Sequence, residues 1–191
     1  MNWLAHFLLA EPAPVFRVGS VLPDFAPAAV LATLPPAFQA GIAQHRQVDL
    51  FTDAHPVVRT SMRRMPPPFR RFAGILTDVF YDHLLTRQWT SYSALPLPAF
   101  AAQIYAAIEE CRPALPPEVY ARLVRLRDAD LLCVYGELAG IAQVLGGIGR
   151  RLRRPFDLAA ALPILEAQYE ALQEDFTGFF PELRAHVAAP R

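Results

Sequence analysis

Two short segments of this chain repeat carboxylate and imidazole side chains at the spacing of one helical turn. They are QHRQVDLFTD, which begins at residue 44, and TDVFYDHLL, which begins at residue 77. The ligand-type positions in them are His45, Asp49, Asp53, Asp78, Asp82 and His83. On a helix, side chains four residues apart share one face, with Cβ atoms roughly 5–6 Å apart. Each segment therefore predicts a polar stripe along a helix.

Both stripes lie in strongly apolar sequence, with Val48, Leu50 and Phe51 in the first and Val79 and Phe80 in the second. An unpaired charge in such surroundings is expensive to bury. A divalent cation between the two helices would remove that cost. Mixed His and Asp ligation suits Mn²⁺, Fe²⁺, Zn²⁺ or Mg²⁺ in a hydrolytic centre. The alternative is a network of salt bridges between these carboxylates and Arg side chains.

His6 and Asp24 are further candidates for the same site, and each also has an ordinary structural explanation. His6 stands alone in the apolar segment WLAHFLL, where a histidine is often a core residue. Asp24 lies in a turn-like stretch around Pro23, where aspartate commonly caps a helix. The recurrence of ligand-type residues in otherwise apolar segments favours including both in the site.

The elements that must position these residues are helices, because β-branched residues are sparse and no Asn-Gly or Asp-Gly hairpin turn occurs. Hydrophobic periodicity predicts helices over 2–10, 36–53, 69–90, 99–111, 117–129, 130–152, 157–177 and 181–188, the last two separated at Pro181. The three prolines at 66–68 predict a boundary between helices, because a helix cannot continue through them. We expect an all-α, single-domain helical bundle that comprises residues 1–191.

Composition excludes several classes of protein. The chain has 191 residues, of which 53% are hydrophobic and 19% charged, and this argues against disorder. No apolar run is long enough to predict a transmembrane helix, and the N-terminal segment lacks the basic residues of a signal peptide. The net charge of zero disfavours nucleic-acid binding. Two cysteines, Cys111 and Cys133, suit free thiols in the cytoplasm.

All 18 basic residues are arginine, and several are adjacent in the sequence. The clusters are Arg63–Arg64, Arg70–Arg71 and the group Arg150, Arg151, Arg153 and Arg154. Local Arg clusters on a neutral protein can bind an acidic partner or a phosphate. A solvated helix face is the alternative explanation for each cluster.

Four motifs give the chain a resemblance to a known family. MNWLAHFLLA, GSVLPDF, GIAQHRQVDLFTDAHP and LTDVFYDHLLTRQW occur in this order, and YEALQEDFTGFFPEL follows near the C-terminus. Together they resemble the acyl carrier protein phosphodiesterases, a divergent branch of the HD-type metal-dependent phosphohydrolases. The resemblance implies an HD-domain-like helical fold. It also implies hydrolysis of holo-acyl carrier protein to the apo form and 4′-phosphopantetheine, with Mn²⁺ as the preferred metal.

The resemblance also supplies roles for individual residues. It implies that the polar positions of the family pattern are Asn2, His6, Asp24, His45, Arg46, Asp49, Asp53, Asp78, Asp82 and His83, and the motifs alone do not decide which of them bind metal. Among them we expect metal binding by His6, Asp24, His45, Asp78, Asp82 and His83, and catalytic roles for Arg46, Asp49 and Asp82. The chain departs from the family at Pro23, where a small residue is more usual, and around residues 135–147, where several polar residues are missing.

The implied partner is holo-acyl carrier protein, which is a small acidic protein. We expect the chain to act in the cytoplasm and to bind neither nucleic acid nor a membrane. A basic docking surface should therefore exist, and the Arg clusters are candidates for it. Two other functions remain open from the sequence: an HD-like phosphohydrolase for a nucleotide or other small phosphoester, and a non-enzymatic helical binding module. The sequence leaves the oligomeric state open.

Overall fold

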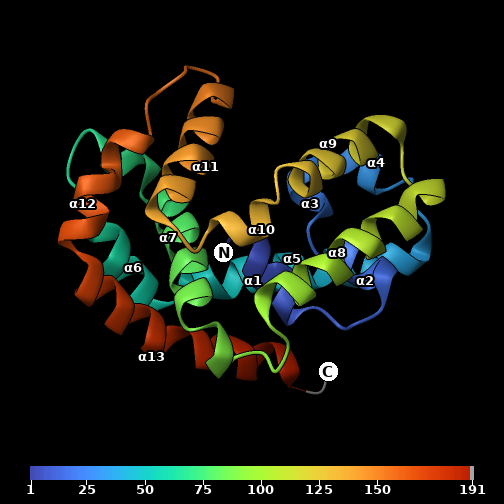
Figure 1. Cartoon of the computed structure of the whole chain (residues 1–191), viewed down its shortest axis with the longest axis horizontal. Coiled ribbons are helices and arrows are strands. Elements are labelled where there is room, and N and C mark those ends of the chain that lie inside the picture. The colour runs from blue at the N-terminus through green and yellow to red at the C-terminus, as the bar shows by residue number, and fades with distance from the viewer. Residues whose placement is uncertain (190–191) are drawn as a thin grey trace. The chain divides into compact units, whose positions relative to one another are not determined.

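The computed structural model describes residues 1–189, and every regular element within them is helical (Figure 1). The predicted all-α class is therefore confirmed. The α-helices are α1 (Trp3–Leu9), α2 (Pro14–Gly19), α3 (Leu22–Phe25), α4 (Ala28–Leu31), α5 (Pro36–Ala54), α6 (Pro56–Arg63), α7 (Ala73–Arg87), α8 (Leu97–Cys111), α9 (Pro117–Asp128), α10 (Leu131–Val134), α11 (Leu138–Arg151), α12 (Leu162–Ala167) and α13 (Tyr169–Ala188). The 3₁₀ turns are η1 (Phe69–Phe72), η2 (Trp89–Ser91), η3 (Arg112–Ala114) and η4 (Ala159–Ala161).

Proline marks the start of many of these helices. α2, α6, α8, α9 and α12 all carry proline at their first or second position. Proline is tolerated there because its fixed φ suits a helix and its missing N–H would have no intrahelical partner. The abundance of proline in this sequence therefore divides the chain into short helices without preventing helix formation.

The chain forms two compact units, each assembled from separate segments. One unit comprises Met1–Asn2, Leu50–Gln88 and Val134–Arg191, and the other comprises Trp3–Asp49 and Trp89–Cys133. We call the first the α7 unit and the second the α1 unit, after a helix that each contains. The single-domain interpretation stays a prediction.

Within the α1 unit, α2 packs on α8, and α8 and α3 both contact α9. Leu4, Phe7, Leu22, Ile104 and Leu123 are fully buried in its core. α2 approaches α5 so closely that two glycines are required. A Cβ atom on Gly41 would lie 2.3 Å from the backbone oxygen of Phe16, and one on Gly19 would lie 2.7 Å from that of Phe38.

Within the α7 unit, α13 packs on α6, and α7 contacts α6, α11 and α13. α7 is buried along most of its length, which explains why its sequence is apolar on more than one face. A buried polar network ties three of these helices together. The Ser61 hydroxyl lies 2.7 Å from the Tyr81 hydroxyl and donates to Asp175, which also pairs with Arg64 at 3.2 Å.

Four expectations about secondary structure need correction. The predicted helix over 130–152 is two helices, α10 and α11, interrupted at residues 135–137. The predicted helix over 69–90 is α7 with a 3₁₀ turn on each side, and the stretch around Pro23 forms the single helical turn α3. The predicted break at Pro181 is wrong, because α13 continues through it.

The continuation of α13 through Pro181 follows from packing. A proline inside a helix costs about 3 kcal/mol, since one backbone hydrogen bond is lost. Phe179, Phe180 and Leu183 flank Pro181 and are completely buried. Each such side chain contributes about 2 kcal/mol when buried, which outweighs the cost of the proline.

Among the described residues, no helix has both the length and the hydropathy needed to cross a membrane.

The contact between α2 and α5 predicts the effect of adding one methyl group. Gly41→Ala should lower the free energy of unfolding by about 2 kcal/mol or more, because the new Cβ meets backbone atoms that cannot rotate away. Gly178→Ala is the matched control: it lies inside α13 with nothing within 4 Å of its Cβ position. It should raise stability by about 0.5–1 kcal/mol. Urea unfolding followed by circular dichroism measures both, and a neutral Gly41→Ala would contradict the close approach.

Candidate metal centre

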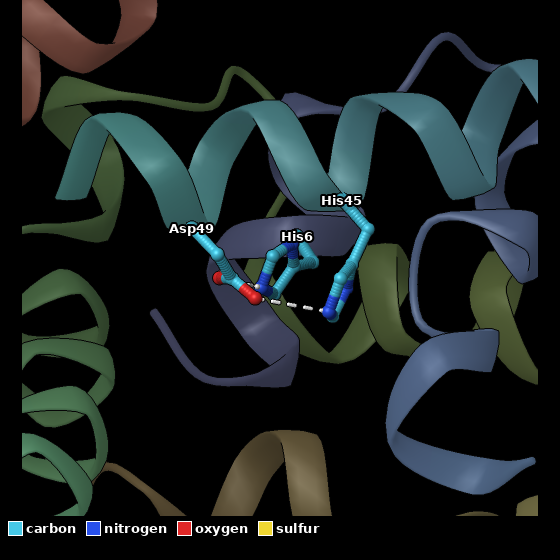
Figure 2. A group of neighbouring side chains, drawn as sticks. All are labelled: His6, His45 and Asp49. Atoms are coloured by element: carbon cyan, nitrogen blue, oxygen red, sulfur yellow. Dashed lines mark ion pairs between the residues drawn. The ribbon is translucent and has the colours of Figure 1, made fainter. Parts of the chain in front are cut away.

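Three side chains from two helices of the α1 unit meet at one point. His6 projects from α1, and His45 and Asp49 project from successive turns of α5 (Figure 2). The Nε2 atom of His45 lies 3.0 Å from Asp49 Oδ2, and that of His6 lies 3.2 Å from Asp49 Oδ1. His6 is 1% exposed, whereas 40% of the Asp49 side chain is exposed. The carboxylate therefore sits between two buried imidazoles and the solvent.

The backbone of Ser20 fixes the orientation of the His45 ring. His45 Nδ1 lies 2.8 Å from the Ser20 carbonyl oxygen, which can only accept a hydrogen bond, so Nδ1 carries the proton. The Ser20 hydroxyl in turn donates to the carbonyl oxygen of Arg17 at 2.7 Å. In the neutral ring, the lone pair of Nε2 then points at Asp49. Two electron-rich atoms face each other at 3.0 Å, an arrangement that requires a proton or a metal cation between them.

His6 is buried without the hydrogen bonds that a structural histidine normally makes. Its Nε2 lies 3.2 Å from Asp49 Oδ1, and within residues 1–189 neither ring nitrogen makes a hydrogen bond of standard geometry. Its ring stacks on that of His45, with centroids 4.1 Å apart and planes 15° apart. Buried polar atoms are usually satisfied. The unsatisfied nitrogens of His6 therefore support a ligand role over the core role that its apolar segment also allowed.

The pKa values of the three groups reflect this crowding. Burial lowers the pKa of His6 to about 4, with His45 adding to the effect and Asp49 opposing it. Burial acts in the same direction on His45, but the carboxylates of Asp49 and Asp24 outweigh it and raise its pKa. Burial would raise the pKa of Asp49, yet the two imidazoles hold it well below its usual range. At neutral pH the cluster thus has an ionised carboxylate and a neutral His6.

Asp24 lies beside this cluster, in the single turn α3. Its Oδ1 lies 3.8 Å from His45 Nε2, and its Oδ2 accepts a hydrogen bond from the Trp3 indole at 3.1 Å. Trp3 also packs against Phe25, with ring centroids 5.3 Å apart and planes tilted by 41°, and this holds the indole in place. Asp24 is therefore oriented toward His45 by a side chain that is itself packed.

The donor set fits a divalent cation. One ligand atom from each of His6, His45 and Asp49 can be chosen so that all lie within 4.8 Å of one another. Ligands at about 2.0–2.2 Å from a single ion lie roughly 3–4.4 Å apart, so small side-chain movements suffice. The backbone hydrogen bond that sets the His45 tautomer is the usual partner of a metal-binding histidine. Nitrogen and oxygen donors suit Mn²⁺, Fe²⁺ or Zn²⁺.

Arg46 and Asp53, the other polar candidates on α5, are exposed.

Three predicted residues of the second stripe lie on α7, in the α7 unit. The carboxylate of Asp78 lies 3.2 Å from the α-amino nitrogen of Met1, and Asp82 is fully buried. His83 Nδ1 donates to the carbonyl oxygen of Tyr135 at 2.7 Å, the same type of contact that His45 makes. Convergence of this stripe with His45 stays a prediction.

Reasoning from the sequence missed the residues that orient the histidines. Ser20 acts through its carbonyl oxygen, and Tyr135 does the same for His83. Tyr169 lies on the other side of His83, with its hydroxyl 3.3 Å from Nε2. Every residue has a backbone carbonyl, so the residue types in the sequence do not indicate which carbonyl accepts these hydrogen bonds. The phenol of Tyr169, 86 positions from His83 in the chain, could be found only from the fold.

Comparison with known proteins settles the family. The profile described as "Acyl carrier protein phosphodiesterase" matches residues 1–183. The chain belongs to this family. It is 36% identical over 193 aligned positions to the acyl carrier protein phosphodiesterase of Salmonella dublin, with 98% of each chain covered. The proteins of the same name from Salmonella agona and Salmonella newport match with the same identity and coverage. No solved structure matches significantly.

This confirms the family and the phosphodiesterase class that the motifs indicated. The chain is an enzyme of the hydrolase class, and the non-enzymatic binding module is excluded. The match extends over the region around residues 135–147, where the sequence pattern was weakest.

The buried His6 makes the stability of the metal-free protein depend on pH. Its pKa is about 4 in the folded state and 6.5 in the unfolded state, so between these values only the unfolded chain binds a proton. Stability is therefore lost as the pH falls from 6.5 to 4, by about 3 kcal/mol from this residue. His6→Asn should remove that part of the loss.

Urea unfolding at pH 7 and pH 4.5, in the presence of chelator, measures the difference. His186→Asn replaces an exposed imidazole and should keep the pH dependence of the unsubstituted protein. Equal loss of stability in the His6→Asn and unsubstituted proteins would mean that His6 is not buried in its neutral form.

Proposed function

We propose that this chain hydrolyses holo-acyl carrier protein to apo-acyl carrier protein and 4′-phosphopantetheine, with a divalent metal ion as cofactor. The full-length match to proteins named for this activity carries the proposal. The cluster of His6, His45 and Asp49 supports it, because phosphodiester hydrolysis is a reaction that such metal centres catalyse. The HD-like fold also belongs to this proposal, and it rests on the family resemblance alone.

The reaction breaks the bond between phosphorus and the oxygen of the carrier serine. Water adds to the phosphorus, the serine oxygen takes up a proton, and 4′-phosphopantetheine leaves as a phosphate monoester. A cation held by the cluster would act as a Lewis acid toward the phosphoryl group and the attacking water. The remaining steps depend on groups of the protein that bind the substrate and transfer its protons.

His6, His45 and Asp49 would hold the cation, with Asp24 as a fourth ligand. Asp49 was predicted as a catalytic carboxylate, but its place between the two imidazole nitrogens favours a ligand role. Arg46 follows His45 on α5 and is exposed, so its guanidinium can bind the non-bridging oxygens of the phosphodiester. The Ser20 carbonyl keeps His45 in the tautomer that presents Nε2 to the cation.

The second stripe contributes either further ligands or proton transfer. We propose Asp78, Asp82 and His83 as metal ligands, with Asp82 also acting in catalysis. The hydrogen bond from His83 to Tyr135 supports a ligand role, because it leaves Nε2 as the lone-pair atom that faces the Tyr169 hydroxyl. Asp82 is fully buried on the same helix as His83, and its proposed role rests on the family resemblance.

Mn²⁺ is the proposed metal, on the strength of the family resemblance. The mixed nitrogen and oxygen ligands do not select strongly among Mn²⁺, Fe²⁺, Zn²⁺ and Mg²⁺, so availability and geometry decide. We propose a cytoplasmic location, because Cys111 and Cys133 are both free thiols.

The proposal predicts the effect of removing one cluster ligand. His45→Ala should lower kcat/KM for holo-acyl carrier protein at least about a hundredfold, because losing a ligand costs more than losing its orienting partner. His186→Ala removes an exposed imidazole outside the cluster and should leave turnover unchanged. Mass spectrometry of the carrier, which loses the mass of the phosphopantetheine group, measures both rates.

The same assay tests whether turnover requires a metal ion. Prolonged treatment with chelator should abolish turnover by the unsubstituted protein, and added Mn²⁺ should restore it. Full activity in excess chelator would exclude a metal mechanism. Full activity of His45→Ala, with metal dependence retained, would place the metal elsewhere.

A further inference from the structure

The structure separates the Arg clusters of the sequence into two groups. In the first group the guanidinium makes contacts within the protein. Arg64 pairs with Asp175 at 3.2 Å, and Arg70 donates to the backbone oxygens of Met65 and Arg63. These side chains stabilise the segment around the three prolines, and they have little freedom to bind a partner.

The second group surrounds a surface pocket in the α7 unit. It is lined by Arg71 and Phe72 and, from the segment that follows α11, by Leu152, Arg153, Arg154 and Pro155. The volume is about 420 Å³. Arg71, Arg153 and Arg154 are exposed, and none forms an ion pair with any carboxylate within residues 1–189. We call this feature the Arg71 pocket.

Aromatic packing holds one wall of the Arg71 pocket in place. The guanidinium of Arg71 lies over the rings of Phe72 and Phe156, 4.6 Å and 4.8 Å from their centroids. Those two rings also contact each other, with centroids 4.8 Å apart. A guanidinium stacked on two rings loses less conformational entropy on binding than a free one.

The segment that follows α11 is anchored to the end of that helix. Phe156 donates its backbone N–H to the carbonyl oxygen of Gly149, and a Cβ on Gly149 would lie 2.1 Å from the Phe156 oxygen. A second cavity of about 320 Å³ shares Pro155 with the Arg71 pocket and is also lined by Arg150, Phe156 and Asp157. The basic groups therefore stand on a fixed surface with an apolar floor.

We propose that the Arg71 pocket is a docking site for an acidic protein partner, with the three guanidiniums binding carboxylates and the apolar floor receiving an apolar side chain. Under the proposed function, on which this inference rests, the partner is the acyl carrier protein. Arg and aromatic residues are the types enriched at protein interfaces. Three cations that pair with no carboxylate of the described residues, together with apolar lining residues, complement an acidic surface that presents an apolar side chain.

Charge reversal in the pocket tests the docking site. Arg71→Glu/Arg154→Glu should raise KM for holo-acyl carrier protein at least tenfold while kcat changes less than twofold. Cleavage of the small reporter bis(4-nitrophenyl) phosphate should stay within twofold of the unsubstituted protein. The increase in KM should shrink as salt is raised, since screening weakens both the attraction and its reversal.

The matched control is Arg59→Glu/Arg151→Glu, which changes the net charge equally at exposed residues outside the pocket. It should alter KM for the carrier less than threefold. An equal rise in KM in both double variants would overturn the docking site, because only net charge would then matter. Parallel losses of carrier and reporter cleavage would also overturn it, since the arginines would then serve folding or the phosphodiester itself.

Binding of the apo-carrier separates this inference from the proposed function. Calorimetric titration with apo-acyl carrier protein involves no turnover. The unsubstituted protein and the control variant should bind it, and the pocket variant should bind at least tenfold more weakly. Failure of holo-carrier cleavage with this binding pattern intact would contradict the proposed function alone. Equal binding by all three proteins, or binding by none, would contradict the docking site.

Discussion

The close contact between α2 and α5 is the constraint on which the proposed metal centre depends. Gly19 and Gly41 allow two backbones to touch where any side chain would collide with a carbonyl group. This contact places the Ser20 carbonyl 2.8 Å from the ring of His45, one turn beyond Gly41 on the same helix. A longer distance between the helices would leave the ring free to rotate, and its Nε2 atom would no longer be directed at Asp49.

The electrostatics of the cluster follow from that geometry. Two stacked imidazoles cannot easily both be in the positively charged imidazolium form, because the two charges would lie about 4 Å apart in a buried setting. Burial keeps His6 neutral, while the carboxylates favour a positive charge at His45. A single divalent cation satisfies both histidines and Asp49 at once, whereas a single proton satisfies only one imidazole. The low solvent exposure of His6 and His45 strengthens this preference.

The sequence predicted the polar stripe of α5 well and its surroundings less well. Steps of four placed His45 and Asp49 on one face correctly, because helical periodicity depends only on local geometry. The role of Ser20 depends on a backbone contact between distant segments, which residue types do not encode. The break at 135–137 and the continuation of α13 through Pro181 likewise reflect packing that outweighs local preference. The HD-like arrangement and the meeting of the α5 and α7 stripes stay predictions.

Nitrogen-15 NMR of the histidine rings tests the proposed metal centre most directly. In metal-free protein at pH 8.5, long-range ¹H–¹⁵N spectra should show His45 with its proton on Nδ1 and with Nε2 as the unprotonated nitrogen. Substoichiometric Mn²⁺ should then broaden the Nε2 signals of His45 and the ring signals of His6 before those of His55 and His186. A His45 ring protonated on Nε2, or broadening that does not distinguish these histidines, would contradict a metal site built on His6, His45 and Asp49.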